Sequence, residues 1–250
     1  MADLSDKLRY KKVFQGTYEY TNNGNVYAEE RFEVYKDQKN YDHIFVAELN
    51  CRTSTGELLK IISHYEMSKN WIPHDVRIER SLGPKSSEEI YAFEAKNNSI
   101  HYTLHTNEVR GDSRFPTAPR FHEAAPCASA SMLFILSTRF DNTARNDYTV
   151  WSSSNQWKYV TPPSPHTISL DRVSVGNETL FINNQELSCI KYLAYDTTHP
   201  NGDDLPFDYR HQQNPLTVYL SGHMAIPYII EGQGSTRIQI KVLNDLSAEE

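Results

Sequence analysis

Several ionisable side chains occupy strand positions whose alternate neighbours are apolar. Alternate side chains of a β-strand point to the same face, and a polar group buried on that face costs free energy unless it is paired or used. Glu30 alternates with Phe32, and His74 alternates with Val76. A desolvated carboxylate has a raised pKa, and an imidazole titrates near neutral pH. Glu30 and His74 are therefore predicted to form a general acid–base pair that faces an enclosed interior.

Phenol and guanidinium groups extend this set. Tyr65 lies on the same predicted strand face as Ile61 and Met67, and it completes a catalytic set with Glu30 and His74 as a donor to a carbonyl or epoxide oxygen. Arginine can hold a carboxylate, an enolate or a phosphate, and aromatic side chains can line the mouth of a pocket. The residues predicted to bind substrate are Arg80, Arg172, Tyr102, Tyr228, Trp71 and Tyr91.

A purely structural interpretation exists for each of these residues. Glu30 could pair with Arg80 or Arg172 as an internal ion pair, and the phenols could reach backbone groups, since buried polar groups are usually hydrogen-bonded. For any single residue this interpretation is favoured. The group as a whole is harder to explain in this way, because internal charges are rare unless they are paired or functional.

Metal, nucleotide and nucleophile motifs are weak. His101 and His105, on one predicted strand, would stand about 13 Å apart, too far to share an ion. No Gly-x-Ser-x-Gly is present, and Gly-Gln-Gly-Ser at 232–235 joins two predicted strands, so a hairpin explains it better than a phosphate site. The three cysteines lack CxxC spacing, and Cys127 is interpreted as a small core residue. The sequence predicts no metal and no cofactor.

The elements that must position these groups are strands. Apolar and polar residues alternate through most of the chain, in segments rich in Tyr, Phe, Val and Ile, which is typical of half-buried antiparallel strands. Short turns such as Asn-Asn-Gly-Asn at 22–25 link them as hairpins. The predicted strands are 12–20, 26–35, 43–51, 58–67, 71–82, 89–95, 99–106, 147–152, 167–175, 179–182, 186–195, 216–220, 226–231 and 236–243.

The pattern changes between the two halves. Residues 114–126 carry three prolines and indicate a crossing loop. Residues 124–137 are small and apolar on all sides, which predicts a buried helix against the concave side of the sheet or across a barrel mouth. The chain is therefore predicted to be one β-rich domain, 1–250, with halves 10–113 and 146–244 joined by the crossing segment 114–145.

The order of a long meander, an apolar helix and a second meander resembles the bacterial lipoprotein-carrier-like folds and related uncharacterised bacterial families. The resemblance is carried by SASMLFILSTRF at 129–140, by the Glu178-Thr179 pair that opens a hairpin, and by the ladder 216–220 followed by Ile226-Pro227-Tyr228. It implies a mainly β fold: a large curved antiparallel sheet or open barrel, lipocalin-like or carrier-like, wrapped around one apolar helix. It also implies a concave apolar face that can hold a hydrophobic guest.

Charge and hydropathy restrict the partners. The chain has 25 basic and 32 acidic residues, a net charge of −7, which argues against nucleic-acid binding. The first residues contain no apolar signal-like stretch, and the longest apolar run, 132–136, is far below the roughly 20 residues that span a bilayer. A cytoplasmic location without membrane insertion is predicted. The polar loop 196–215, above all 203–210, could be a lid or the contact of a homodimer.

Three functional classes remain open from the sequence. The first is intracellular binding of a hydrophobic small molecule in the β-sheet cup. The second is a cofactor-independent lyase, isomerase or hydratase that uses the His, Glu and Tyr groups on an apolar substrate in the same cup. The third is a scaffold component that associates through a long loop or an exposed sheet edge.

Overall fold

A single antiparallel sheet organises the molecule. The computed structural model describes residues 9–137, 145–174, 176–197, 215–222, 224–232 and 234–247. Within these residues fifteen strands join one sheet, accompanied by one short helix. The strands are β1 (Tyr10–Asn22), β2 (Asn25–Asp37), β3 (His43–Arg52), β4 (Leu58–Met67), β5 (Pro73–Leu82), β6 (Lys85–Glu94), β7 (Ser99–Thr106), β8 (Arg110–Pro116), β9 (Arg145–Ser152), β10 (Ser164–Arg172), β11 (Glu178–Ile182), β12 (Gln185–Asp196), β13 (Leu216–Ser221), β14 (Pro227–Glu231) and β15 (Thr236–Asp245), and the helix is α2 (Phe134–Ser137).

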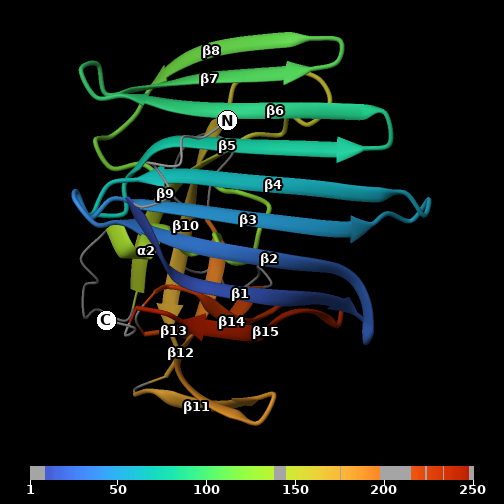
Figure 1. The fold of residues 1–250 in the computed structure, drawn as a ribbon, viewed down its shortest axis with the longest axis vertical. Coiled ribbons are helices and arrows are strands. Elements are labelled where there is room, and N and C mark those ends of the chain that lie inside the picture. The colour runs from blue at the N-terminus through green and yellow to red at the C-terminus, as the bar shows by residue number, and fades with distance from the viewer. Residues whose placement is uncertain are drawn as a thin grey trace.

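The first and last strands of the chain pair with each other and so join its two halves into one sheet. The order is β8-β7-β6-β5-β4-β3-β2-β1-β15-β14-β13-β12-β10-β9, with β11 paired to β12 off this path. The first eight strands are a plain meander, and β1 pairs with β15 to continue the sheet into the second half. Figure 1 shows β1 to β8 as one broad layer, below which the β11 hairpin projects from the body. The predicted large antiparallel sheet in a mainly β fold is confirmed.

The sheet curls until its two edges approach each other. Phe115 of β8 stacks on Trp151 of β9 with their ring centroids 4.3 Å apart. The backbone of the crossing segment covers the β9 edge, because Ala124 N donates to Trp151 O at 2.8 Å and Trp151 N donates to His122 O at 2.8 Å. The fold is therefore barrel-like, although β8 and β9 do not pair as strands.

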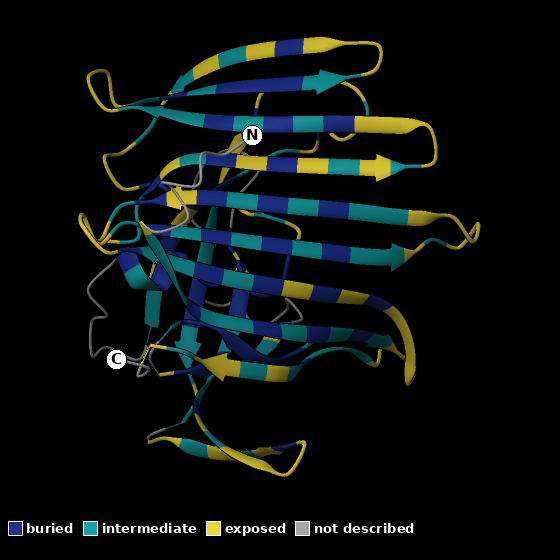
Figure 2. Ribbon diagram, viewed as in Figure 1, coloured by how far each residue is buried: buried dark blue, intermediate teal, exposed yellow. Residues whose placement is uncertain are grey.

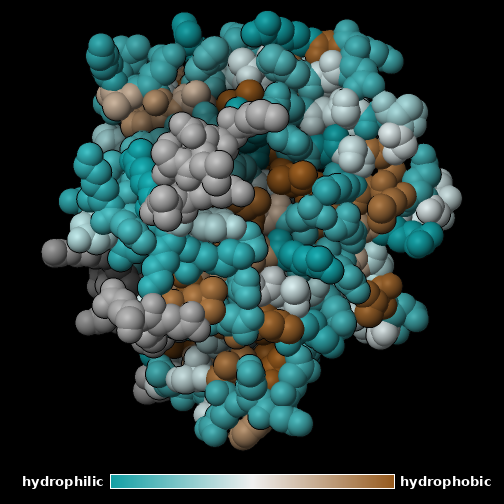
Figure 3. Space-filling model, in the orientation of Figure 1, coloured by the Kyte–Doolittle hydropathy of each residue, from teal (hydrophilic) through white to brown (hydrophobic). Residues whose placement is uncertain are grey.

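The inner face of the curl forms the core. Buried and more exposed residues alternate along the strands of the meander, as Figure 2 shows. Val34, Phe45 and Val76 are fully buried, and burying a side chain of this size contributes about 1.5–3 kcal/mol. On the face in Figure 3, hydrophobic side chains form separate patches within a mostly hydrophilic surface. Among the described residues, no helix has the length and hydrophobicity that crossing a membrane would need.

The buried segment that leads to α2 differs from its predicted form. A helix was expected over 124–137, but only Phe134–Ser137 is helical. Before it the chain forms four-residue turns, in which Ser131 N donates to Ala128 O at 3.1 Å and Leu133 N donates to Ala130 O at 3.2 Å. From Cys127 onward the segment is largely buried, as expected, so its conformation is set by tertiary contacts and not by helix propensity.

Two further predictions concern loops. The sequence predicts a crossing loop at 114–126, but the predicted start is too early. Strand β8 extends through Pro116 and pairs with β7. The loop at 203–210, expected to act as a lid or a dimer contact, lies outside the described residues.

Candidate functional site

Six polar side chains meet inside the curl, and we call them the interior polar cluster. Adjacent strands contribute most of them, because inward positions of neighbouring strands stand in register: Tyr91 of β6 lies directly opposite Tyr102 of β7. The crossing segment supplies one more side chain from the opposite side. The members are Tyr65 (β4), Arg80 (β5), Glu89 and Tyr91 (β6), Tyr102 (β7) and Glu123.

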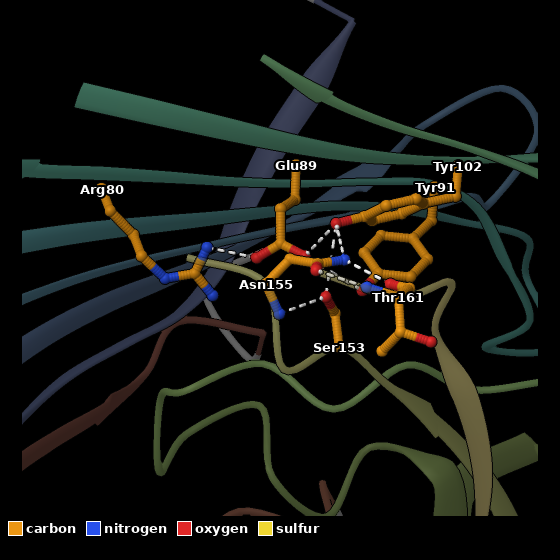
Figure 4. A network of polar contacts seen from close by, with 7 residues as sticks. All are labelled: Arg80, Glu89, Tyr91, Tyr102, Ser153, Asn155 and Thr161. Carbon is orange, nitrogen blue, oxygen red and sulfur yellow. Dashed lines mark hydrogen bonds and ion pairs between the residues drawn. The ribbon is translucent and has the colours of Figure 1, made fainter. Parts of the chain in front are cut away.

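Glu89 is the centre of this cluster and is fully partnered. Its Oε1 forms an ion pair with Arg80 Nη1, and both side chains are withdrawn from solvent, with exposed fractions of 11% for Arg80 and 0% for Glu89. Its Oε2 accepts a hydrogen bond from Tyr102 Oη at 2.8 Å and a longer one from Tyr91 Oη at 3.4 Å. Figure 4 shows Arg80 on one side of Glu89 and the two phenol rings on the other. A buried charge with these partners is compensated.

Glu123 is the second carboxyl group of the cluster and is not fully partnered. Its exposed fraction is 5%. Tyr65 Oη donates to the Glu123 backbone oxygen at 3.1 Å and lies 3.5 Å from Oε2, but Oε1 has no hydrogen-bond partner within the described part of the chain. Burial first, and then the charge of Glu89, raise the pKa of Glu123 well above its usual range, and the hydroxyls of Tyr91 and Tyr65 offset this only in part. The acid form of Glu123 is therefore favoured.

The loop between β9 and β10 covers the cluster. Asn155 is fully buried, and its Nδ2 donates to Tyr102 Oη at 3.0 Å and to Thr161 O at 2.8 Å. Its Oδ1 accepts from Val160 N at 2.7 Å, so one amide both shapes the loop and holds it on the cluster. Ser153 lies 3.3 Å from the same Tyr102 oxygen. Figure 4 shows Ser153, Asn155 and Thr161 gathered around Tyr102.

A second contact holds this loop at β8. The ring of Tyr159 lies against Gly111, where an added Cβ would come within 2.1 Å of Tyr159 Cδ2. Only a residue without a Cβ allows the ring this close. The loop 153–163 is therefore docked at two points, through Asn155 on Tyr102 and through Tyr159 on Gly111.

Gly111→Ala is expected to displace this loop. The new methyl group overlaps Tyr159 Cδ2 and also comes within 2.9 Å of its Cβ, so we expect a loss of about 1–2 kcal/mol in unfolding free energy and faster hydrogen exchange in 153–163. Tyr159→Ala removes the clash, so the double variant should be more stable than additivity predicts. Gly176→Ala, with no atom within 4 Å of the new Cβ, is the control. Additive losses would contradict the docking.

Four of the residues predicted from the sequence are brought together here, namely Tyr65, Arg80, Tyr91 and Tyr102. Glu30 lies elsewhere on the inner face. Its carboxylate accepts hydrogen bonds from Ala128 N at 2.8 Å and Ser129 N at 3.0 Å, and from the hydroxyls of Tyr20 and Ser129. The alternative ion pair of Glu30 with Arg80 or Arg172 is not formed, because backbone and hydroxyl donors satisfy its charge.

His74 is not on the inner face, so the prediction that places it beside Glu30 is wrong. The β4–β5 pairing sets Glu66 opposite Asp75 and Met67 opposite Pro73, which leaves His74 as the extra residue of a β-bulge. The alternation expected from Val76 is broken at that point, and His74 is exposed. The predicted acid–base pair is therefore not assembled.

The remaining predicted residues have other partners. Trp71 lies in the turn before β5 and stacks on His43, with ring centroids 4.0 Å apart. Arg172, at the end of β10, donates from Nε to Ser174 O at 2.9 Å. Tyr228 is buried in β14, in the second half of the sheet.

Sequence reasoning missed Glu89, Glu123 and Asn155. A signal for Glu89 was present, since it alternates with Tyr91 and Phe93 along β6. Glu123 and Asn155 lie outside regular strands, where no periodicity marks the inward positions. Within the described residues, no group of three or more His, Cys, Asp or Glu side chains could hold a metal ion.

Fold and site together define a β-barrel-like fold with a polar cluster buried on its inner face. The chain resembles the crystal structure of a β-barrel-like protein of the domain of unknown function DUF1849 from Brucella abortus, with a TM-score of 0.56 and 7% identity over 94% of this chain and 98% of that one. A DUF1089 family protein from Pseudomonas aeruginosa gives a TM-score of 0.48 and 7% identity over 82% and 90%. The sequence matches no protein-family model and no curated protein. These likenesses concern the fold alone.

Proposed function

We propose that the protein binds a small, largely apolar molecule at the interior polar cluster, beneath the loop 153–163. The proposal keeps the hydrophobic guest expected from the sequence but anchors it on Glu89, Glu123 and the neighbouring phenols. The barrel-like fold supports it, because the mouths and interiors of such folds commonly hold ligands with a few convergent polar groups.

The observation that carries the proposal is the unpartnered Oε1 of Glu123. Leaving a buried polar atom without a partner costs about 1–3 kcal/mol, and an apolar residue at this position would avoid that cost. Perturbed carboxyl groups beside a second charge are found most often at functional sites. Glu123 combines both features, because burial and the charge of Glu89 raise its pKa.

A ligand reaches the cluster by displacing the loop. The loop is held through Asn155 and through the Tyr159 ring on Gly111, both of which are local contacts that can open without unfolding the sheet. Loops of this kind open on microsecond to millisecond timescales in many binding proteins.

Calorimetric titration with three probes of equal chain length, 1-decanol, decanoate and decylamine, tests the proposal. We expect at least one probe to bind the wild-type protein, and Glu89→Gln to weaken that binding at least tenfold, because it removes the negative charge that pairs with Arg80 and leaves one acceptor oxygen where Arg80 and Tyr102 now have two. Glu88→Gln is the matched control on the same strand, since Glu88 is the preceding residue and points to the other face. Failure of all three probes, or equal effects of the two variants, would overturn the proposal.

Acid–base catalysis is a second candidate, favoured by one observation. The two carboxyl groups have different surroundings: Glu89 is paired with Arg80, whereas burial raises the pKa of Glu123. Such pairs divide the roles of base and acid in metal-free enzymes. In this version of the predicted lyase, isomerase or hydratase, Glu123 replaces His74. A bound ligand recovered chemically unchanged after prolonged incubation would argue for binding alone.

A further inference from the structure

We infer that the ligand of the interior polar cluster carries a protonated amine, held between the Glu123 carboxylate and the surrounding phenol rings. This inference rests on the proposed function and names the chemical class of its ligand. Three observations lead to it: the count of donors and acceptors, the balance of charge, and the arrangement of the aromatic rings.

When Glu123 is ionised, the cluster has an acceptor to spare. Arg80 and Tyr102 donate to Glu89, and Tyr65 donates to the Glu123 backbone oxygen. Asn155 donates to Tyr102. The atom left over is Glu123 Oε1, which accepts when the group is ionised. The complementary ligand group is therefore a hydrogen-bond donor.

In the bound state, with Glu123 ionised, the charge balance favours a cationic donor. Arg80 is the single cation of the cluster, and its ion pair with Glu89 already uses that charge. Ionised Glu123 would add a second negative charge that Arg80 offsets only in part. A ligand carboxylate or phosphate would increase the imbalance, whereas an ammonium group would remove it. A hydroxyl could donate to Glu123 but would leave its charge uncompensated.

The aromatic rings add a surface that suits a cation. The Tyr91 and Tyr102 rings lie 4.9 Å apart, and the Tyr159 ring of the covering loop lies 6.3 Å from Tyr102. Tyr65 approaches Glu123 from β4. Ammonium groups are attracted to the faces of such rings, most strongly where water is excluded.

Binding of an ammonium group should release a proton. Burial and the charge of Glu89 raise the pKa of Glu123 and so favour its carboxylic acid form in the free protein, whereas an ammonium ligand pairs with the carboxylate. The O–H bond of Glu123 therefore breaks, and its proton passes to the buffer while the ligand keeps its own. The affinity for an amine should rise with pH while the free protein is still protonated at Glu123, by up to tenfold per pH unit.

The three decyl probes used to test binding also test this inference. We expect decylamine to bind at least tenfold more tightly than 1-decanol or decanoate. Titrations in phosphate and in Tris, which differ in ionisation enthalpy, should show release of up to one proton per decylamine bound. Glu123→Gln should abolish the preference for the amine and the proton release, whereas Glu88→Gln should change neither.

The outcomes separate this inference from the proposed function. Binding of 1-decanol or decanoate as tight as that of decylamine, with sensitivity to Glu89→Gln retained, would overturn the amine and leave the binding site standing. Decylamine binding without proton release, measured on the wild-type protein, would also overturn the role of Glu123. Absence of binding by every probe would overturn the proposed function itself.

Discussion

Glu30→Ala is expected to lower the free energy of unfolding by about 3–5 kcal/mol, the range found when one member of a buried charged network is removed. The Glu30 carboxylate is fully buried and accepts from two backbone N–H groups, those of Ala128 and Ser129. The hydroxyls of Tyr20 and Ser129 are also bonded to it. Alanine would leave these buried donors without an acceptor and would release the interior segment from β2.

Urea denaturation of paired variants measures this effect. Glu29→Ala is the matched control, because Glu29 is the preceding residue on β2 and is exposed. It should change stability by no more than about 0.5 kcal/mol, as is usual for surface substitutions. Glu30→Gln keeps one acceptor and should lose less than Glu30→Ala. Equal losses at Glu29 and Glu30 would show that the carboxylate does not hold the segment.

The strands were predictable from the sequence wherever alternation was strong. β4 and β7 begin and end where the pattern predicts, at Leu58–Met67 and Ser99–Thr106. β8 was missed, because Arg110–Pro116 holds a glycine, a proline and three charged residues and has little strand propensity of its own. Its pairing with β7 makes it a strand. Likewise, no local pattern indicates that β1 pairs with β15, because that contact joins the two ends of the chain.

The candidate site was also predictable only in part, because alternation along a strand predicts local faces but not tertiary contacts. Alternation placed Tyr65, Arg80 and Tyr102 on inner faces, where the structure has them. It failed at His74, because a bulge shifts the register by one residue and reverses the face. It says nothing of Glu123, whose position depends on how the crossing segment meets β9.

Two buried glutamates show why burial alone does not identify a functional residue. Glu30 and Glu123 both lie inside the curl. Burial raises the pKa of each, but Glu30 is surrounded by donors that lower its pKa in opposition to burial, whereas Glu123 keeps an unpartnered oxygen. The first is explained by the fold it holds together. Nothing in the described part of the chain completes the second, and it is therefore the better marker of a site.

Acidification is expected to destabilise the protein through His122, by about 3 kcal/mol between pH 6.5 and pH 4. Burial lowers the pKa of His122 from 6.5 to about 3 in the folded protein. Between these two values the unfolded chain binds a proton that the folded protein does not bind. The unfolding free energy therefore falls as the pH is lowered through this window. The raised pKa values of Glu30 and Glu123 act in the opposite direction, so the effect must be measured against a variant.

His122→Gln provides that comparison, because glutamine cannot be protonated in this range and can still bond to Ser137, the partner of His122 Nε2. Urea denaturation at half-unit pH steps should show the wild-type protein losing about 3 kcal/mol relative to the variant from pH 6.5 to pH 4. The exposed His74 supplies the control: His74→Gln removes one imidazole without touching the interior and should follow the wild-type curve. Parallel curves for the wild-type and His122→Gln proteins would mean that solvent reaches the His122 ring in the folded state, and that the crossing segment does not seal the β9 edge.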